Sequence, residues 1–194
     1  MKLRSILVTS FTTALVSLSA MATEYTIDAS HSNVGFTIRH FVSKVGGGFS
    51  DFSGTIQFDE KNLEKSSASA VIKAASINTL NAKRDGHLKS PDFFNVEKHA
   101  DLSFQSKKFK KTGTKTYVVD GDFTMLGVTK PVSLKLEYAG STKNFDGIQV
   151  AGFVATGKIN RKDFGMVWNK TLDKNLVLGE EVDLTLNLEA IEKK

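Results

Sequence analysis

The sequence has no cysteine and only two prolines among its 194 residues. The lack of cysteine excludes disulfide bonds, thiolate metal sites, a cysteine nucleophile and a lipid-modified N-terminal cysteine. Beyond the first 22 residues, no stretch is apolar enough to predict a membrane-spanning helix. The fold must therefore be stabilised by its own core, and a domain of this length can bury roughly 70% of its unfolded surface.

The N-terminal segment has the pattern of a secretory signal peptide. Lys2 and Arg4 precede the apolar-rich run ILVTSFTTALVSLSA, which ends in the small-residue site Ala20-Met21-Ala22. A membrane anchor is the alternative, but the run is short and rich in Ser and Thr, whereas a spanning helix needs roughly 20 apolar residues. We expect residues 1–22 to be a signal peptide and residues 23–194 to form one exported domain.

The charge of the mature chain is mildly positive. Removing Lys2 and Arg4 leaves 24 basic residues against 21 acidic residues, a net charge of +3. For an exported protein, this balance argues against nucleic acid as a partner. The densest basic cluster surrounds Phe109 and consists of Lys107, Lys108, Lys110 and Lys111. A solvated strand end is the favoured interpretation, and contact with anionic lipid headgroups is the alternative.

Apolar and polar residues alternate along most of the chain, as is typical of half-buried β-strands. The clearest example is 182–190, and others lie at 34–40, 52–58, 102–104, 123–125, 132–138 and 148–154, where Val150 and Val154 fall on the apolar face. One face is persistently apolar and short turns separate the segments. This pattern predicts an all-β fold of about eight antiparallel strands closed into a barrel, with a two-sheet sandwich as the alternative.

Three segments depart from this alternation. Helical spacing between Ser76 and His99 predicts a short helical insertion, capped by Asn78 or Thr79, followed by a helical turn at Ser90-Pro91. Residues 46–48 are three glycines, which predict a strand bend or bulge. Residues 127–131 are expected to form a turn.

Catalytic signatures are lacking in the sequence. It contains no G-x-S-x-G elbow, no H-E-x-x-H motif and no P-loop. The four histidines show no close ligand spacing, so no metal site is predicted. His40 stands apart because it continues the apolar face of Phe36 and Ile38, either as a polar anchor inside the barrel or as a satisfied core residue.

Phenylalanine dominates the aromatic composition, with 14 Phe against one Trp and three Tyr. On the expected inner faces Phe alternates with small residues, as in Phe52, Gly54 and Phe58. Small residues either interdigitate with large ones in a solid core or leave room for a ligand. An eight-stranded barrel is near the size at which the interior holds one small ligand, so the pattern leaves both outcomes open.

Four ordered segments resemble the YceI family, exported lipocalin-like proteins of bacteria. They are YTIDASHS at 25–32 with VGF at 34–36, HLKSPDFF at 87–94, GDFTMLGVTKPV at 121–132 and INRKDFGM at 159–166. The resemblance spans nearly the whole mature chain. It implies an extended eight-stranded antiparallel lipocalin-like barrel with a helical insertion. The barrel would enclose an elongated apolar pore that holds a polyisoprenoid chain or a related amphiphile such as an isoprenoid quinone.

The resemblance also implies a function and a location. We expect a periplasmic binding or carrier protein, not an enzyme, with a bound isoprenoid lipid and no covalent cofactor. Transient membrane contact for loading and a homodimer are further expectations. An enzyme acting on such a lipid, or an interaction domain with a solid core, are the alternatives.

The expected pore wall follows from the apolar faces, with a few polar groups choosing the headgroup. Wall residues are expected at Phe36, Ile38, His40, Phe52, Ile56, Phe58, Phe104, Phe123, Met125, Leu134, Leu136, Trp168, Leu184 and Leu186. Arg39 and Arg84, with His40, are the headgroup candidates.

Overall fold

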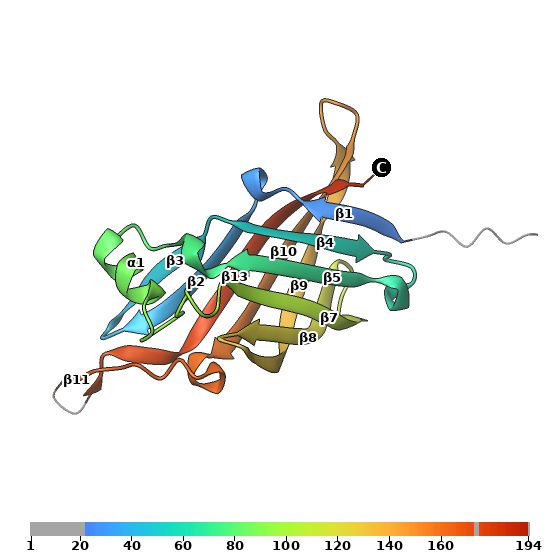
Figure 1. Cartoon of the computed structure of the whole chain (residues 1–194). Coiled ribbons are helices and arrows are strands. Elements are labelled where there is room, and N and C mark those ends of the chain that lie inside the picture. Colours follow the sequence, from blue (N-terminus) through green and yellow to red (C-terminus); the bar gives the residue numbers. More distant parts are fainter. Residues whose placement is uncertain (1–21, 173–174, 194) are drawn as a thin grey trace, which may run out of the picture.

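The structure, a computed structural model, describes residues 22–172 and 175–193. Its main feature is an antiparallel sheet of eleven strands, eight of which close into a barrel (Figure 1). The closed ring runs in the order β1-β4-β5-β7-β8-β9-β10-β13, and β13 pairs with β1. The predicted all-β barrel is therefore confirmed, and the closing pair excludes the two-sheet sandwich.

The strands of the ring have between 5 and 16 residues, and three further strands extend the sheet at one end. The ring consists of β1 (Thr23–Ile27), β4 (Phe52–Phe58), β5 (Ser67–Lys73), β7 (Asp101–Lys111), β8 (Thr116–Met125), β9 (Val128–Lys143), β10 (Gln149–Asn160) and β13 (Leu178–Glu192). The extension consists of β2 (Asn33–His40), β3 (Ser43–Phe49) and β6 (Ile77–Asn78), and it joins the ring where β2 pairs with β13.

Short helical elements interrupt or connect these strands. The 3-10 helices are η1 (Ala29–His31), η2 (Leu63–Lys65), η3 (Ala74–Ser76) and η4 (Arg161–Phe164). Outside the main sheet, β11 (Thr171–Leu172) and β12 (Asn175–Leu176) form a separate two-stranded sheet. Because η1 lies between β1 and β2 and both pair with β13, the two strands act as one long strand with a break.

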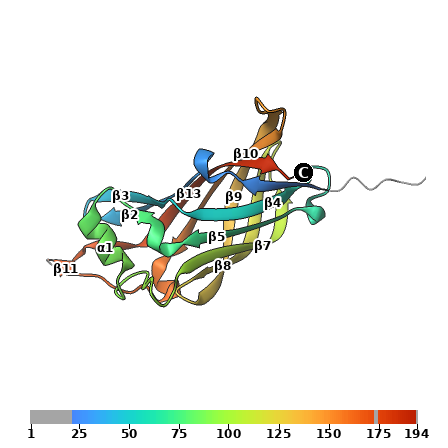
Figure 2. The ribbon, with the colours of Figure 1, turned by 45° about the horizontal axis from the view of Figure 1, so that its top comes forward.

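The helical insertion covers one end of the barrel, where α1 (Ala82–Lys89) lies beside the β2–β3 hairpin (Figures 1 and 2). A short helix was predicted here and is confirmed. Its cap is Asn81, whose Oδ1 accepts a hydrogen bond from Arg84 N at 3.0 Å. The predicted cap at Asn78 or Thr79 is wrong because Asn78 belongs to β6 and the Thr79 hydroxyl donates to Asp85.

The segment after α1 forms a series of turns. Phe93 N donates to Ser90 O at 3.0 Å, so a turn starts at the predicted Ser90-Pro91 position, although it does not continue as a helix. Phe94 N then donates to Leu88 O at 2.9 Å. These bonds fold the two phenylalanines back against the end of α1.

The glycine triplet lies in a regular strand, so the predicted bend or bulge is wrong. Gly46 pairs with Thr37 and Gly48 with Gly35 in an unbroken β2–β3 register. A Cβ at Gly47 would lie 2.7 Å from both Phe36 Cζ and Thr79 Cγ2. Glycine is required there because a ring and a methyl group approach the backbone closely.

The turn predicted at 127–131 is shorter than expected. The β8–β9 connection contains Leu126 and Gly127, with φ of 54° and 75°. Positive φ at both central residues is the geometry of the two-residue hairpins that match strand twist. Pro131 already belongs to β9, opposite Asp122.

The core consists of two clusters along the barrel. One is rich in aromatic residues and includes Phe58, Tyr117 and Phe153, and the other lies under the insertion and includes Phe93 and Phe164. Phe153 is 1% exposed. Ala151, Phe153 and Ala155 share the buried face of β10, whose register with β13 is unbroken. The predicted inner position of Val154 is therefore wrong, because Phe153 and Ala155 on either side of it line the cavity.

The predicted signal peptide, residues 1–22, lies outside the described residues except for Ala22. Within the described part of the chain, no helix has both the length and the apolar character needed to cross a membrane.

Candidate functional site: an apolar cavity along the barrel

The barrel encloses a cavity of about 370 Å³. This volume lies within the roughly 300–1,000 Å³ of small-molecule sites. Every strand of the closed ring contributes to its wall, together with β2, β3 and α1. Inward side chains alternate with outward ones along each strand, so a continuous apolar wall results from the period-2 pattern.

The structure brings nearly all of the predicted wall residues together around this one cavity. Those that line it are Phe36, Ile38, His40, Phe52, Ile56, Phe104, Phe123, Met125, Leu134, Leu136, Trp168, Leu184 and Leu186. Their geometric placement is thus established, whereas their role in binding stays a prediction.

Phe58 is the exception among the predicted wall residues. It is 7% exposed and packs into the aromatic cluster beyond the cavity. Its ring centroid lies 5.3 Å from that of Tyr117, 5.0 Å from Tyr138 and 5.5 Å from Phe153. Phe58 ends β4 at the barrel end remote from α1. It therefore closes the barrel instead of lining the cavity.

The two predicted arginines lie on opposite sides of the wall. Arg39 is exposed because strand alternation turns its side chain outward between Ile38 and His40. Its Nη1 donates a hydrogen bond to Phe41 O at 2.9 Å. Its predicted place at a headgroup is not supported. Arg84 lines the cavity from α1, and its Nε and Nη2 both donate to Thr79 at 2.7 Å.

An aromatic group closes much of the α1 end. The ring of His87 lies 5.0 Å from those of Phe93 and Trp168, and the latter two are 5.0 Å apart. His87 Nε2 also contacts Asp92 Oδ2 at 2.8 Å. All three rings line the cavity, so side chains of the insertion form part of the binding surface as well as its cover.

Arg161 is a cavity residue that the sequence interpretation missed. It is 1% exposed at the end of β10, where its Nε donates to Gly179 O at 2.8 Å and its Nη1 to Met166 O at 2.6 Å. Burial lowers the pKa of its guanidinium, and the Glu180 carboxylate partly opposes that shift. Arg161 lies in the INRKDFGM segment. The basic character of that motif is the sequence signal that could have pointed to a buried arginine.

Within the part of the chain that the structure describes, one nitrogen of Arg161 has no hydrogen-bond partner. Among the described residues, its Nη2 is buried without a hydrogen bond. The carboxylate of Glu180 is bonded to Lys162 Nζ, at 2.5 Å. Leaving a buried donor unpaired costs roughly 1–3 kcal/mol, and more for a charged group. The arrangement is therefore an unfavourable one for a purely structural residue.

The lysine cluster of β7 lies away from the α1 end. Lys107 and Lys110 pair with Asp122 and Asp120 of β8, at 2.7 and 2.6 Å. Phe109 between them is 6% exposed. These ion pairs agree with the favoured interpretation, a solvated strand end.

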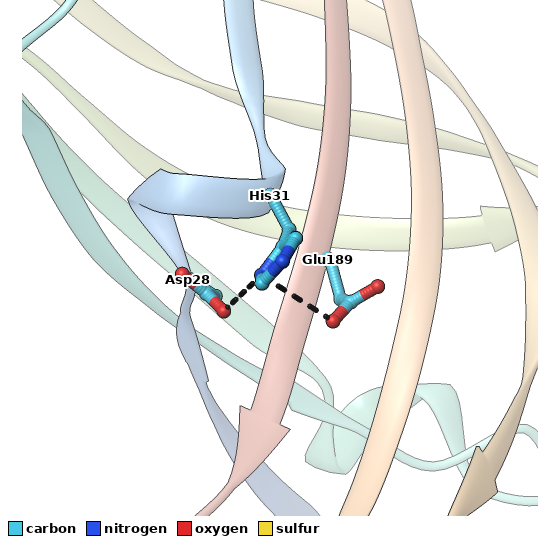
Figure 3. Close-up of side chains that lie close together, drawn as sticks. All are labelled: Asp28, His31 and Glu189. Carbon is cyan, nitrogen blue, oxygen red and sulfur yellow. Dashed lines mark hydrogen bonds and ion pairs between the residues drawn. The ribbon is translucent and has the colours of Figure 1, made fainter. Parts of the chain in front are cut away.

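Asp28, His31 and Glu189 form an ionisable cluster on the outside of the barrel (Figure 3). His31 Nδ1 lies 2.8 Å from Asp28 Oδ2 and 4.0 Å from Glu189 Oε1. The hydrogen bond from His31 lowers the pKa of Asp28 to about 2, and Asp28 in turn raises the pKa of His31. Asp28 also caps η1 by accepting from Ser30 N at 2.9 Å. The cluster's evident role is to fix the break between β1 and β2.

The chain is similar to known proteins in both sequence and fold. The family model described as "YceI-like domain" matches residues 25–190. A relative from Photorhabdus laumondii, UPF0312 protein plu2095, is 42% identical over 179 residues, which cover 91% of this chain and 90% of that protein.

Two solved structures show the same fold. The Campylobacter jejuni YceI protein is 37% identical, with a TM-score of 0.70 over 86% of this chain and 96% of that one. A polyisoprenoid binding domain from Saccharophagus degradans is 15% identical, with a TM-score of 0.62 over 87% and 98%. The second likeness concerns the fold alone. By the family match and the identity to its relatives, the chain belongs to the YceI-like family.

Proposed function

We propose that the chain is a binding or carrier protein for a polyisoprenoid or isoprenoid-quinone-like lipid, held in the barrel without covalent catalysis. The observation that carries this proposal is the apolar cavity of about 370 Å³ inside a closed barrel. A solid-core interaction domain would have no such space. The shared fold with a domain described as polyisoprenoid-binding supports the same ligand class.

The energetics of an apolar wall favour a long hydrocarbon. Each buried methylene contributes about 0.8 kcal/mol, so even two isoprene units supply several kcal/mol before the cost of association. This contribution has no direction. Affinity is therefore expected from the tail, and selectivity from the few polar groups at the α1 end.

The test is native mass spectrometry of protein purified from the producing cell, followed by denaturation and identification of released molecules. A stoichiometric isoprenoid lipid supports the proposal. If the protein is recovered without a ligand and fails to bind added isoprenoid lipids of several lengths, the proposal is wrong.

We further propose a periplasmic location after cleavage at Ala22. The charged start, apolar run and small-residue exit of residues 1–22 support it. Intact mass and N-terminal sequencing of the protein from a periplasmic extract are expected to give a chain that begins at Thr23. A full-length chain in the cytoplasmic fraction would contradict this proposal.

We also propose that the α1 end touches a membrane during loading. Val42 on the β2–β3 hairpin and Leu80 before α1 are fully or almost fully exposed, at 104% and 94%. Val167, beside Trp168, is 64% exposed. Apolar side chains exposed at the end where side chains of the insertion cover the cavity are suited to contact with a lipid surface.

Vesicle co-sedimentation tests this contact. Val42→Glu and Leu80→Glu are expected to weaken association with vesicles and to slow ligand transfer. Phe145→Glu is the matched control, because Phe145 is 110% exposed on the β9–β10 hairpin, away from α1. Equal effects of all three changes would contradict a contact at the α1 end. The homodimer remains a prediction, which analytical ultracentrifugation checks.

A further inference from the structure

The ionisable side chains of the cavity wall are arginines and histidines. Among the described lining residues, the charged ones are Arg84 and Arg161, no carboxylate is present, and the imidazoles of His40 and His87 complete the ionisable set. A wall of this kind disfavours a cationic headgroup and favours one that accepts hydrogen bonds.

Arg161 is the best positioned of these donors. Its Nε and Nη1 are held by the carbonyls of Gly179 and Met166, which fixes the plane of the guanidinium. The remaining Nη2 is buried and has no hydrogen-bond partner in the described chain. A donor that is already oriented loses little freedom on binding, so a headgroup contact here would be preorganised.

Among residues 22–172 and 175–193, the charge of Arg161 also lacks a bonded counterion. Glu180, the acid that acts on it electrostatically, is bonded to Lys162 outside the barrel. No carboxylate of the described residues lies within 4.0 Å of the Arg161 guanidinium. The position therefore suits a carbonyl or phosphate oxygen, which supplies the acceptor that the protein does not.

We propose that Arg161 Nη2 donates a hydrogen bond to an oxygen of the ligand's headgroup, so that the barrel selects oxygen-bearing isoprenoids over plain hydrocarbons. The inference rests on the proposed function. It places the headgroup near the end of β10 on the α1 side, with the tail running toward the aromatic cluster of Phe58, Tyr117 and Phe153.

The test compares three probes: squalene, a ubiquinone with a short isoprenoid tail, and a polyprenyl phosphate of the same tail length. The wild-type protein is expected to bind at least one oxygen-bearing probe about tenfold or more tightly than squalene, as a hydrogen bond to a charged group allows. Arg161→Gln is expected to abolish that preference while changing squalene affinity less than about twofold. Which probe is preferred distinguishes a quinone carbonyl from a phosphate as the source of the oxygen.

Lys158→Gln is the matched control, since Lys158 lies on β10 close to Arg161 in the sequence but is exposed and pairs with Glu181 and Asp183. It is expected to retain the preference, and Arg161→Lys, which keeps the charge, to retain part of it. If Arg161→Gln does not fold, infrared spectroscopy of carbonyl-labelled quinone in the wild-type protein replaces it, with a lowered carbonyl frequency expected relative to alkane solution.

The outcomes separate the two proposals. If none of the probes binds the wild-type protein, the proposed function fails. If squalene and the oxygen-bearing probes bind the wild type equally, or if Arg161→Gln keeps the preference, only the headgroup inference is overturned. An unshifted carbonyl frequency in the bound quinone also overturns Arg161 as donor to a quinone.

Discussion

At the scale of single residues, two glycines of the barrel strands leave space that aromatic rings of neighbouring strands occupy. A Cβ on Gly121 would lie 2.6 Å from the ring of Phe104, and one on Gly47 would lie 2.7 Å from that of Phe36. The alternation of Phe with small residues left open whether the gaps are filled or free. At these two positions the rings fill them, and the cavity lies beyond the rings. The pattern could not decide this because the ring and its glycine lie on different strands.

This close approach predicts a loss of stability in Gly121→Ala. The new methyl group would also lie 2.6 Å from Gln105 O, a backbone atom that cannot move aside. Overpacking of this kind costs about 1–3 kcal/mol, measurable by urea unfolding. Gly86→Ala is the control, because nothing lies within 4 Å of its added Cβ and alanine favours the helix by roughly 1 kcal/mol. Equal effects of the two changes would contradict the packing described.

The pair Asp28 and His31 predicts a pH-dependent contribution to stability. The pKa of Asp28 falls from 3.8 to about 2 in the folded protein, so its contribution is present above pH 3.8 and is lost as the pH falls through 2. The pKa of His31 rises above 6.5, so its contribution is present below pH 6.5 and is lost as the pH rises through the folded value.

The window between pH 4 and 6.5 follows from these two directions. In it, His31→Gln is expected to lower the melting temperature slightly, and the difference from wild type should vanish near pH 9. Calorimetry at pH 5 and pH 9 measures this, with a reduction in high salt because the histidine is exposed. A difference that is the same at both pH values would contradict the pairing.

At the scale of elements, alternation located the cavity wall well but not its limits. The β13 residues Leu184 and Leu186 line the cavity where alternation placed them, because their strand crosses the whole barrel. Phe58 obeys the same alternation, yet it lies where β4 has already entered the aromatic cluster. The position at which a cavity ends depends on packing between distant strands, which one strand's pattern does not contain. Arg161 was missed because it follows the end of a strand and has no periodic neighbours.

The face of β13 predicts opposite outcomes for two neighbouring tryptophan substitutions. Leu186 faces the cavity and is only partly buried, so Leu186→Trp is expected to occupy ligand space and to reduce lipid binding about tenfold or more while the protein stays folded. Asn187→Trp places the same ring on the exposed face and should leave binding unchanged. Native mass spectrometry gives the bound fraction, and circular dichroism checks folding. Similar binding by both variants would contradict the wall assignment.

The contact of Trp168 with the insertion predicts a change in tryptophan fluorescence when the ligand binds. Trp168 is the single tryptophan of the sequence and lines the cavity against His87 and Phe93. A quinone headgroup at the α1 end is expected to quench its emission in a saturable titration, whereas an alkane of equal length should not. Quenching that grows linearly without saturation would indicate collisions in solution instead of a site.

At the scale of the whole molecule, the two ends of the barrel differ in chemistry. The α1 end holds Arg84 and Arg161 together with exposed apolar side chains, and the other end is closed by packed aromatic rings. The barrel itself could be predicted from alternation and turns. This polarity could not, because it depends on which strand ends the topology brings together.

Enclosure of a lipid by the closed barrel predicts that ligand binding raises the free energy of unfolding. A ligand enclosed by strands from the entire ring binds the folded state and not the unfolded one. At a free concentration 100 times the dissociation constant, it stabilises by about 2.7 kcal/mol, which scanning calorimetry of protein with and without lipid detects. An unchanged melting temperature despite stoichiometric binding would mean that the lipid binds the unfolded chain as well as the folded one, which contradicts enclosure by the barrel.

The seam between β1 and β13 joins the first and last strands of the domain, with Tyr25 opposite Glu192 and Lys193 N donating to Glu24 O at 2.9 Å. During synthesis, β1 therefore has one of its two neighbours missing until the final strand emerges. The barrel can close only after β13 has been synthesised. Truncation before β13 therefore leaves an open sheet with two unpaired edges instead of a smaller pocket. Because β1 and β13 are neighbours, a short peptide could link the two ends of the domain in a circular permutant. Its new termini would lie in the 144–147 turn, and the α1 end of the barrel would be unchanged.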